Sequence, residues 1–221
     1  MAAERWATFD CYGTLIDWMG GIRQVLGDLF PSRDADELLH RYHEIEPGLQ
    51  HGVGTPYRKV LSDGLVLLAE REHLTLEEGE RTALADSLPS WPPFREVPSS
   101  LAEIRARGWH LAILSNTDPD YLDASFELIG VEPDLEIAAS DIGSYKPAHR
   151  HWEVFFERTG ADPSRHVHVA ASLFHDIAPA SELGLRTVWI NRQHETSELP
   201  RAAELTDLDK LPETLDDLVP A

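Results

Sequence analysis

Short apolar runs alternate with longer amphipathic segments along most of the chain outside residues 18 to 92. The runs that we expect to form strands are mostly apolar and β-branched, as in strands that are covered on both faces of a sheet. They span residues 5–9, 110–114, 135–139, 167–171 and 187–191. Amphipathic segments followed by glycine lie between them, and glycine just past a helix supplies the left-handed residue that ends it. This alternation predicts an α/β fold built on a doubly wound parallel sheet.

The amphipathic segments in this part of the chain predict helices that return the chain to the sheet. They run from Ser99 or Ser100 to Arg107, over 119–129, over 149–159, and from Asp176 to the residue before Gly184. A last periodic stretch, LPETLDDLV, predicts one more helix close to the end of the sequence. These helices are long enough to cover both faces of the sheet.

Residues 18 to 92 have a different pattern, with weak strand signals and repeated helical periodicity. The expected helices span 21–29, 35–45, 56–72 and 75–87, and a proline-rich stretch at 88–94 follows them. The chain should therefore leave the sheet after its first strand and return about 75 residues later, a spacing that follows from these boundaries. We expect residues 1–17 and 93–221 to form the α/β core and residues 18–92 to form an inserted helical cap.

Composition narrows the classes of partner. The 19 basic and 39 acidic residues give a net charge of −20, which argues against nucleic acid and against an anionic membrane surface. The single cysteine excludes an intrachain disulfide framework. No apolar run approaches the roughly 20 residues of a membrane span, and the N-terminus shows no secretory pattern, so we expect a cytoplasmic protein.

Polar residues follow four of the five expected strands. Asp10 follows the first strand, the pair Ser115 and Asn116 follows the second, Lys146 comes after the third, and Asp176 lies in the loop after the fourth. Because ligands bind outside the carboxyl ends of parallel strands, we expect these side chains to converge at one edge of the sheet. The predicted site combines two carboxylates, one lysine and one hydroxyl–amide pair.

The order and spacing of these residues resemble the haloacid dehalogenase superfamily, whose core is Rossmann-like. The matching motifs are Asp-x-Tyr-Gly-Thr-Leu from Asp10, Leu-Ser-Asn at 114–116, Tyr-Lys-Pro at 145–147 and an acidic loop that ends at Asp176. The helical insert is similar to that superfamily's first type of cap. By this resemblance Asp10 is the nucleophile, Thr14 supports its loop and Lys146 neutralises the carboxylates. Ser115 and Asn116 would bind the anionic part of the substrate.

Two departures separate the chain from the metal-dependent phosphatases of that superfamily. Tyr12 stands where those enzymes carry an acid/base aspartate, and a phenol with a reference pKa near 10 is a poor acid for a leaving alkoxide. Ala171 replaces a metal-binding aspartate, and an alanine offers Mg²⁺ no oxygen ligand. We therefore expect neither a metal nor a cofactor, and a leaving group that departs without a proton.

Halide displacement from carbon meets both requirements. The tyrosine at position 12 resembles the L-2-haloacid dehalogenase branch, which forms an aspartyl ester on the substrate's α-carbon and then hydrolyses it. The expected substrate is a short 2-haloalkanoic acid, and the resemblance leaves a homodimer open. Two alternatives stay open as well. One is another hydrolase on this scaffold, either an Mg-dependent phosphatase or an enzyme that opens a strained ring beside a carboxylate. The other is a binding protein without chemistry.

The remaining candidates concern the halide and the water. By resemblance, Arg41 receives the halide from the cap. We also expect Asn116 to supply an amide donor to the halide, and Tyr12 and Phe174 to form walls of the halide site. The final motif lacks the residues that hold water in the best-known dehalogenases. We therefore expect Ser172 and His175 to replace them, with His175 beside Asp176 as the base for ester hydrolysis.

Overall fold

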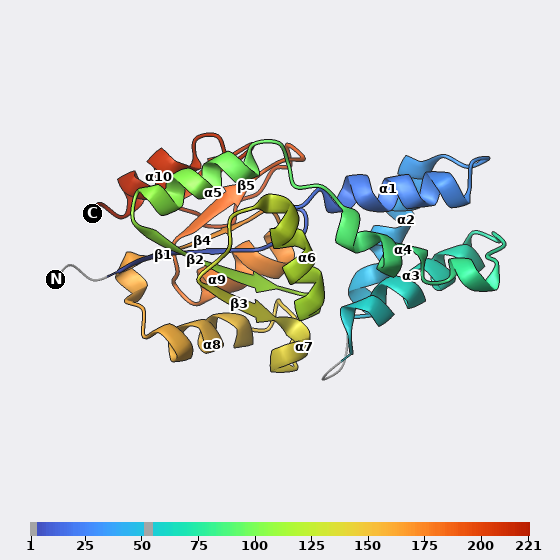
Figure 1. The fold of residues 1–221 in the computed structure, drawn as a ribbon, viewed down its shortest axis with the longest axis horizontal. Helices are drawn as coiled ribbons and strands as arrows, with labels where there is room; N and C mark the ends of the chain where they lie inside the picture. Colours follow the sequence, from blue (N-terminus) through green and yellow to red (C-terminus); the bar gives the residue numbers. More distant parts are fainter. Residues whose placement is uncertain (1–3, 51–54) are drawn as a thin grey trace.

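A six-stranded parallel sheet forms the centre of the larger part of the molecule (Figure 1). The computed structural model describes residues 4–50 and 55–221. The strand order is β3-β2-β1-β4-β5-β6, with β1 Arg5–Phe9, β2 Trp109–Ser115, β3 Leu135–Ala138, β4 His166–Ala170, β5 Thr187–Ile190 and β6 Ala203–Leu205. The chain order reverses at β1, which pairs with β2 on one side and β4 on the other. This is the switch point at which parallel sheets bind ligands.

Helices cover both faces of this sheet, which confirms the predicted doubly wound α/β core. The helices of the core are α5 Val97–Ala106, α6 Pro119–Ile129, α7 Ala139–Ile142, α8 Arg150–Thr159, α9 Ala178–Glu182 and α10 Leu211–Leu218. In Figure 1, α5 and α10 lie along one side of the sheet and α8 lies along the other. Left-handed glycines end three of these helices: Gly130 with φ 73° ends α6, Gly143 with φ 63° ends α7 and Gly160 with φ 63° ends α8.

The helices between β1 and α5 lie together at one end of the molecule, beyond the sheet (Figure 1). They are α1 Trp18–Leu29, α2 Ala35–Ile45, α3 Tyr57–Arg71 and α4 Ala83–Ser87, with 3₁₀ turns at Glu46–Gly48, Glu78–Glu80 and Leu88–Ser90. The chain passes from the core into these helices near residue 17 and returns to the core near residue 93. These two crossings lie side by side, because Asp17 N donates to Pro92 O and Phe94 N donates to Leu15 O, both at 2.9 Å. We propose these crossings as the limits of the cap, residues 18–92.

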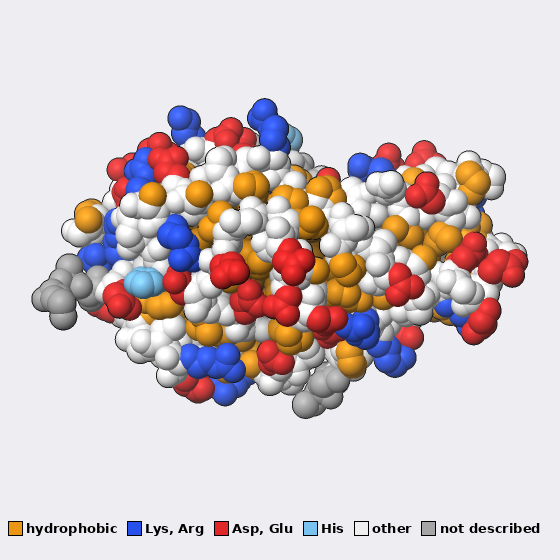
Figure 2. Space-filling model, in the orientation of Figure 1, with side chains coloured by type: hydrophobic (Ala, Val, Ile, Leu, Met, Phe, Trp, Pro, Cys, Tyr) orange, Lys and Arg blue, Asp and Glu red, His pale blue; other side chains and the backbone are white. Residues whose placement is uncertain are grey.

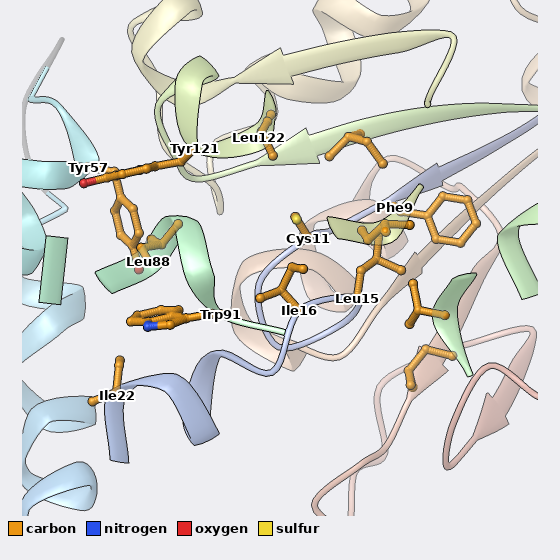
Figure 3. Close-up of a cluster of buried hydrophobic side chains, with 14 of the residues drawn as sticks. Phe9, Cys11, Leu15, Ile16, Ile22, Tyr57, Leu88, Trp91, Tyr121 and Leu122 are labelled. Atoms are coloured by element: carbon orange, nitrogen blue, oxygen red, sulfur yellow. The ribbon is translucent and has the colours of Figure 1, made fainter. Parts of the chain in front are cut away.

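Apolar packing continues across the junction between the two parts. Figure 3 shows Leu15 and Ile16, which follow β1, close to Leu88 and Trp91, which lead back to the core. All four side chains are at most 3% exposed. The junction is therefore packed like a protein interior. Buried side-chain contacts, and not only the two connecting segments of the chain, hold the cap against the core.

The structure differs from the predicted elements in several places, among them the short helix α7, which was not predicted. The helix expected over 75–87 forms only in its last part, as α4, because Gly79 disfavours a helix and Glu77 and Glu80 close a capping box around a short 3₁₀ turn. Strand β6 was not predicted. The helix expected to begin at Asp176 begins earlier, as a π-helical turn Leu173–Ile177 that leads into α9.

Acidic side chains are prominent on the face shown in Figure 2, in keeping with the net charge of −20. Within residues 4–50 and 55–221, no helix has the length and apolar character that a membrane span requires.

Candidate active site

One lysine joins two buried carboxylates at the carboxyl edge of the sheet. Asp10 follows β1, Asp176 lies in the turn after β4, and Lys146 comes from the loop between α7 and α8. The Lys146 ammonium donates to Asp10 Oδ1 at 2.9 Å, to Asp176 Oδ1 at 2.6 Å and to the carbonyl of Leu114 at 2.7 Å. The three charged side chains are at most 10% exposed, so these contacts are made away from bulk water.

Burial and charge act in opposite directions on the protonation of this group. Burial disfavours the ammonium, but Asp10 and Asp176 outweigh it and raise the pKa of Lys146. Burial, opposed by Lys146 and reinforced by Asp176, raises the pKa of Asp10. The pKa of Asp176 is lowered, because Lys146 and a hydrogen bond from His168 overcome the effect of burial. Asp176 is therefore the anion that keeps Lys146 charged, and Asp10 is the more basic carboxylate.

The loop after β1 fixes the orientation of Asp10. Thr14 Oγ1 donates to Asp10 Oδ2 at 2.7 Å and accepts from the Ala171 N–H at 2.9 Å. Gly13 has φ 90°, a conformation that favours glycine and lets the loop turn back under the carboxylate. Both oxygens of Asp10 thus receive one donor each, and the carboxylate is held in one orientation.

A chain of buried side chains supports Asp176 from the sheet. His168 Nε2 lies 3.0 Å from Asp176 Oδ1, and Thr8 Oγ1 lies 2.8 Å from both His168 Nδ1 and His166 Nε2. These residues face one side of neighbouring strands β1 and β4. Burial lowers the pKa of His166 to about 3, so its ring is neutral. His168 therefore contacts Asp176 directly, and Thr8 links His168 to His166. The neutral His166 adds no positive charge to this chain of hydrogen bonds.

A cavity of about 490 Å³ opens above Asp10. Its core-side wall includes Asp10, Tyr12, Ser115, Asn116, Lys146, Ala171, Ser172, His175, Asp176, Asn191 and Arg192. Its cap-side wall includes Trp18, Met19, His43, Glu46, Pro47, Gln50 and Tyr57. The structure therefore brings most of the predicted site residues together and encloses them with residues of the cap.

Ser115 and Asn116 present polar atoms at the end of β2. Ser115 Oγ is buried and has no hydrogen-bond partner within the described chain. Asn116 Oδ1 accepts from the Lys146 N–H at 2.6 Å, and its amide donates to the Lys146 carbonyl at 2.9 Å and to Gln50 Oε1 of the cap at 3.2 Å. Ser115 is the free donor for a ligand, while Asn116 holds the lysine loop and contacts the cap.

Ser172 and His175 interact in the turn after β4. Ser172 Oγ accepts from the His175 N–H at 3.0 Å and lies 3.1 Å from the His175 ring atom Nδ1. Burial lowers the pKa of His175, and Lys146 adds to that effect, so the neutral ring persists below its ordinary range. If Nδ1 carries the proton, it donates to Ser172 and leaves Nε2 as a free base.

Two predicted residues, Arg41 and Phe174, do not lie in the cavity as expected. Arg41 of α2 does not line the cavity: its side chain is 45% exposed, and its guanidinium lies 3.7 Å from Glu44 and 3.8 Å from Glu72. The halide role expected for it is therefore not supported, because α2 turns this side of the helix away from the site. Phe174 is 61% exposed and borders a separate recess beside Pro47 and Tyr145.

Tyr12 lines the cavity as expected, but its hydroxyl is engaged elsewhere. It donates to the Tyr121 carbonyl at 3.1 Å and lies 3.0 Å from Ser125 Oγ of α6. Burial raises the pKa of Tyr12 well above its ordinary value. The residue therefore contributes its ring to the wall and has no proton to give to a leaving group.

Several residues of the cavity were not predicted from the sequence. On the cap side they include Trp18, Glu46 and Tyr57, which sequence pattern alone does not separate from core positions. On the core side they are Asn191 and Arg192, which directly follow β5. The rule that polar residues after a strand face the site had a signal here, and applying it to the fifth strand would have found them.

The donor set does not fit a divalent cation. Ala171 lines the cavity at the position where the related phosphatases carry a metal-binding aspartate, and it has no side-chain oxygen. Among residues 4–50 and 55–221 there is no cluster of three or more His, Cys, Asp or Glu side chains arranged to hold a metal. Lys146 occupies the space between the two carboxylates.

The chain is similar to known proteins over most of its length. The chain is 31% identical over 193 residues to the (S)-2-haloacid dehalogenase of Pseudomonas sp. (strain YL), covering 83% of this chain and 81% of the relative. It is 25% identical over 199 residues to (S)-2-haloacid dehalogenase 4A of Burkholderia cepacia, covering 88% and 86%. The crystal structure of a dehalogenase with an intermediate complex superposes with a TM-score of 0.86 at 22% identity, covering 100% and 99%.

The family model for haloacid dehalogenase-like hydrolases matches residues 5–184, which span β1, the whole of the cap and the sheet as far as α9. The match includes Asp10, Lys146 and Asp176, whose geometry is given above. The chain belongs to the haloacid dehalogenase-like hydrolase family.

Proposed function

We propose that this protein hydrolyses short 2-haloalkanoic acids to 2-hydroxy acids through an ester on Asp10, without a metal ion. The observation that carries the proposal is the position of Tyr12. The acid/base position of the related phosphatases holds a phenol whose hydroxyl faces Tyr121 and Ser125, so the site offers no acid there. Two relatives named (S)-2-haloacid dehalogenases support the same chemistry.

The first step is displacement at the α-carbon. An Asp10 oxygen attacks that carbon, the carbon–halogen bond breaks, and the halide leaves with the bonding electrons. Inversion follows because the attack is in line. Lys146 and Thr14 orient the attacking carboxylate through its two oxygens. Ser115, whose hydroxyl is buried and free, donates to the carboxylate of the substrate.

The second step returns Asp10 to its free form. Water attacks the carbonyl carbon of the Asp10 ester, and His175 Nε2 takes a proton from that water. The bond between the carbonyl carbon and the ester oxygen then breaks, and the proton passes to the departing alkoxide. The hydroxyl oxygen of the 2-hydroxy acid therefore comes from Asp10, and the water oxygen stays in the Asp10 carboxylate. The developing negative charge on the ester carbonyl faces donors already present, Lys146 or Thr14. Asp176 Oδ2 has no hydrogen-bond partner within the described residues, so it can accept from the same water.

A phosphatase is the competing function. One relative, the glyceraldehyde 3-phosphate phosphatase of Methanothermobacter thermautotrophicus, is 25% identical over 108 residues, which cover 48% of this chain. Ala171 and Tyr12 argue against that reaction, because Ala171 offers a metal ion no oxygen ligand and the Tyr12 phenol is a poor acid for a leaving alkoxide. Ring opening beside a carboxylate remains an alternative reaction. Three expectations remain predictions: the absence of a cofactor, a cytoplasmic location and a homodimer.

Halide release from L-2-chloropropionate in the presence of EDTA tests the proposal. We expect turnover that chelation leaves unchanged, with D-lactate as the product because the attack inverts the α-carbon. Phosphate release from phosphate esters that requires Mg²⁺, with no halide release from either enantiomer of the chloroacid, would establish the phosphatase alternative instead. Size-exclusion chromatography with light scattering on the same preparation tests the homodimer.

A further inference from the structure

Glu46 lines the same cavity as Asp10 but has no part in the steps above. It lies at the end of α2, where the turn Glu46–Gly48 begins, and it is 6% exposed. Its hydrogen-bonding neighbours are Tyr57 and Gln50, both of which are uncharged. Ionising a buried carboxyl group that has no cation beside it costs free energy. Such a group in the cavity of a candidate active site is therefore a candidate for a functional role.

The direction of the hydrogen bonds around Glu46 is fixed. Trp18 Nε1 can only donate, and it donates to the Tyr57 hydroxyl at 2.9 Å. Tyr57 therefore uses its own proton toward Glu46 Oε1, also at 2.9 Å. Tyr57 has no further proton for a ligand. Around Tyr57, the side chains that could donate a hydrogen bond to a substrate are therefore Glu46 in its protonated form, Gln50 and His43.

The charges of the cavity leave little room for another anion. Lys146 is shared by Asp10 and Asp176, and Arg192 donates to Glu96 at 2.7 Å. A carboxylate substrate adds one negative charge. An ionised Glu46, which is itself buried, would then repel that charge within the same cavity.

We propose that Glu46 determines the specificity of the cap by admitting an anionic substrate only when its carboxyl group is protonated. In that form it donates a hydrogen bond to the leaving halogen. In-line displacement drives the halogen away from Asp10, and Glu46 lines the same cavity from the cap side. The proton stays on Glu46 throughout, and the halide leaves as the anion. This inference rests on the proposed function, since it takes the substrate to be a carboxylate.

The protonation of Glu46 falls in the range where enzymes work. Burial raises the pKa of Glu46 to about 7, against the hydrogen bonds from Tyr57 and Gln50 that lower it. Because the pKa is raised, the carboxyl group is neutral below about pH 7 and becomes an anion as the pH rises. The fraction of protein that can take up an anionic substrate should then fall about tenfold for each further pH unit.

Other groups around Glu46 and the cavity give pH effects of different sign or range. Burial raises the pKa of Tyr42, Tyr57 and Tyr145 above their ordinary values, and burial lowers the pKa of His43 and His175. The remaining charged groups that line the cavity are Asp10, Lys146, Asp176, Arg192 and Glu195. Loss of a proton from Asp10 or His175 increases activity as the pH rises. A decline above neutral pH therefore reports Glu46.

Kinetics of halide release from L-2-chloropropionate between about pH 5.5 and about pH 9 test this proposal. We expect kcat/KM of the wild type to fall about tenfold per pH unit above about pH 7, through KM. Glu46→Gln keeps a neutral side chain of similar shape and should show no such decline. Tyr57→Phe removes a hydrogen bond that lowers the pKa of Glu46, so its decline should move to higher pH. Glu44→Gln, on the exposed side of the same helix, is the matched control and should follow the wild type.

A decline above pH 7 that persists unchanged in Glu46→Gln would overturn the proposal. Should that variant fail to fold, calorimetry on the wild type decides the question. Propionate binding at pH 8, measured in two buffers of different ionisation enthalpy, should take up about one proton, since the bound state requires a protonated Glu46. Binding without proton uptake would also overturn it. A wild type that releases no halide at any pH contradicts the proposed function, while proton uptake with propionate still reports on Glu46.

Discussion

Neighbouring side chains of the loop after β1 point in different directions, and this separates the nucleophile from its rival. Asp10 faces the cavity, where Lys146 and Thr14 hold it. Cys11 is fully buried in the apolar cluster of Figure 3, where burial raises the pKa of its thiol well above the ordinary value. A protonated thiol in an apolar core is not a nucleophile.

Asp10→Asn should abolish turnover, because an amide oxygen is a poor nucleophile toward a saturated carbon. Cys11→Ala should keep turnover of the wild-type order. Halide release measures both variants. In single turnover in ¹⁸O-labelled water, mass spectrometry should find the label in Asp10 and not in the first product. Label that appears first in the product would mean direct attack by water.

His175 is expected to act in the second step alone. His175→Asn should release one equivalent of halide and then stall, since loss of a positioned general base typically costs about 10²- to 10⁴-fold in rate. Mass spectrometry of the stalled protein should show the adduct on Asp10. Near-wild-type turnover with no adduct would assign water activation to Asp176 and leave His175 a packing role. Because the pKa of His175 is lowered, the step should weaken only as the pH falls below about 6.5, the ordinary value.

At the level of elements, the first turn of α3 depends on a residue from the other part of the molecule. No side chain of its own caps this helix. The Asp118 carboxylate, at the start of α6, accepts from the Tyr57 N–H at 2.8 Å and from the Arg58 N–H at 3.1 Å. The negative charge also suits the positive end of the helix. Asp118 thus ties the helix that carries Tyr57 to the segment that follows Asn116.

Asp118→Ala should destabilise the protein by about 1–3 kcal/mol, the usual cost of leaving buried N–H groups without their acceptor. Urea unfolding of the variant measures the loss. Asp120→Ala is the control: Asp120 is 62% exposed and pairs with Arg58 at the surface, so its loss should cost less than about 1 kcal/mol. Equal losses for both variants would mean that the buried contact contributes no more than the surface ion pair.

At the level of the whole molecule, the cavity is closed by two segments far apart in the sequence. The core supplies the lysine, the two aspartates and much of the polar wall, and the cap closes the cavity with aromatic, aliphatic and polar side chains that include Glu46. One apolar cluster runs from β1 through the two crossings into the cap (Figure 3). The same contacts that bury the crossings also place Glu46 and Tyr57 above Asp10. The junction between the cap and the core therefore contributes both to the packing of the molecule and to the wall of the cavity.

The sequence alone was sufficient for the α/β core, the position of the helical insert and the residues at four strand ends. These features are local: a buried strand is a short apolar run, and the topology of a parallel sheet carries whatever follows each strand to one edge. Asp10, Ser115, Lys146 and Asp176 were found in this way. Asn191 and Arg192 obey the same rule and were within its reach.

Only the tertiary structure decided which cap residues face the site. A helix has one buried stripe, and periodicity cannot say whether that stripe meets apolar core or a cavity. Arg41 lies in the predicted helix 35–45 and Glu46 directly follows that helix, yet the packing of α2 exposes the first and buries the second beside the cavity. The buried neighbours that set the pKa of Glu46, Tyr57 on α3 among them, come from other elements, and such surroundings exist only after the chain has folded.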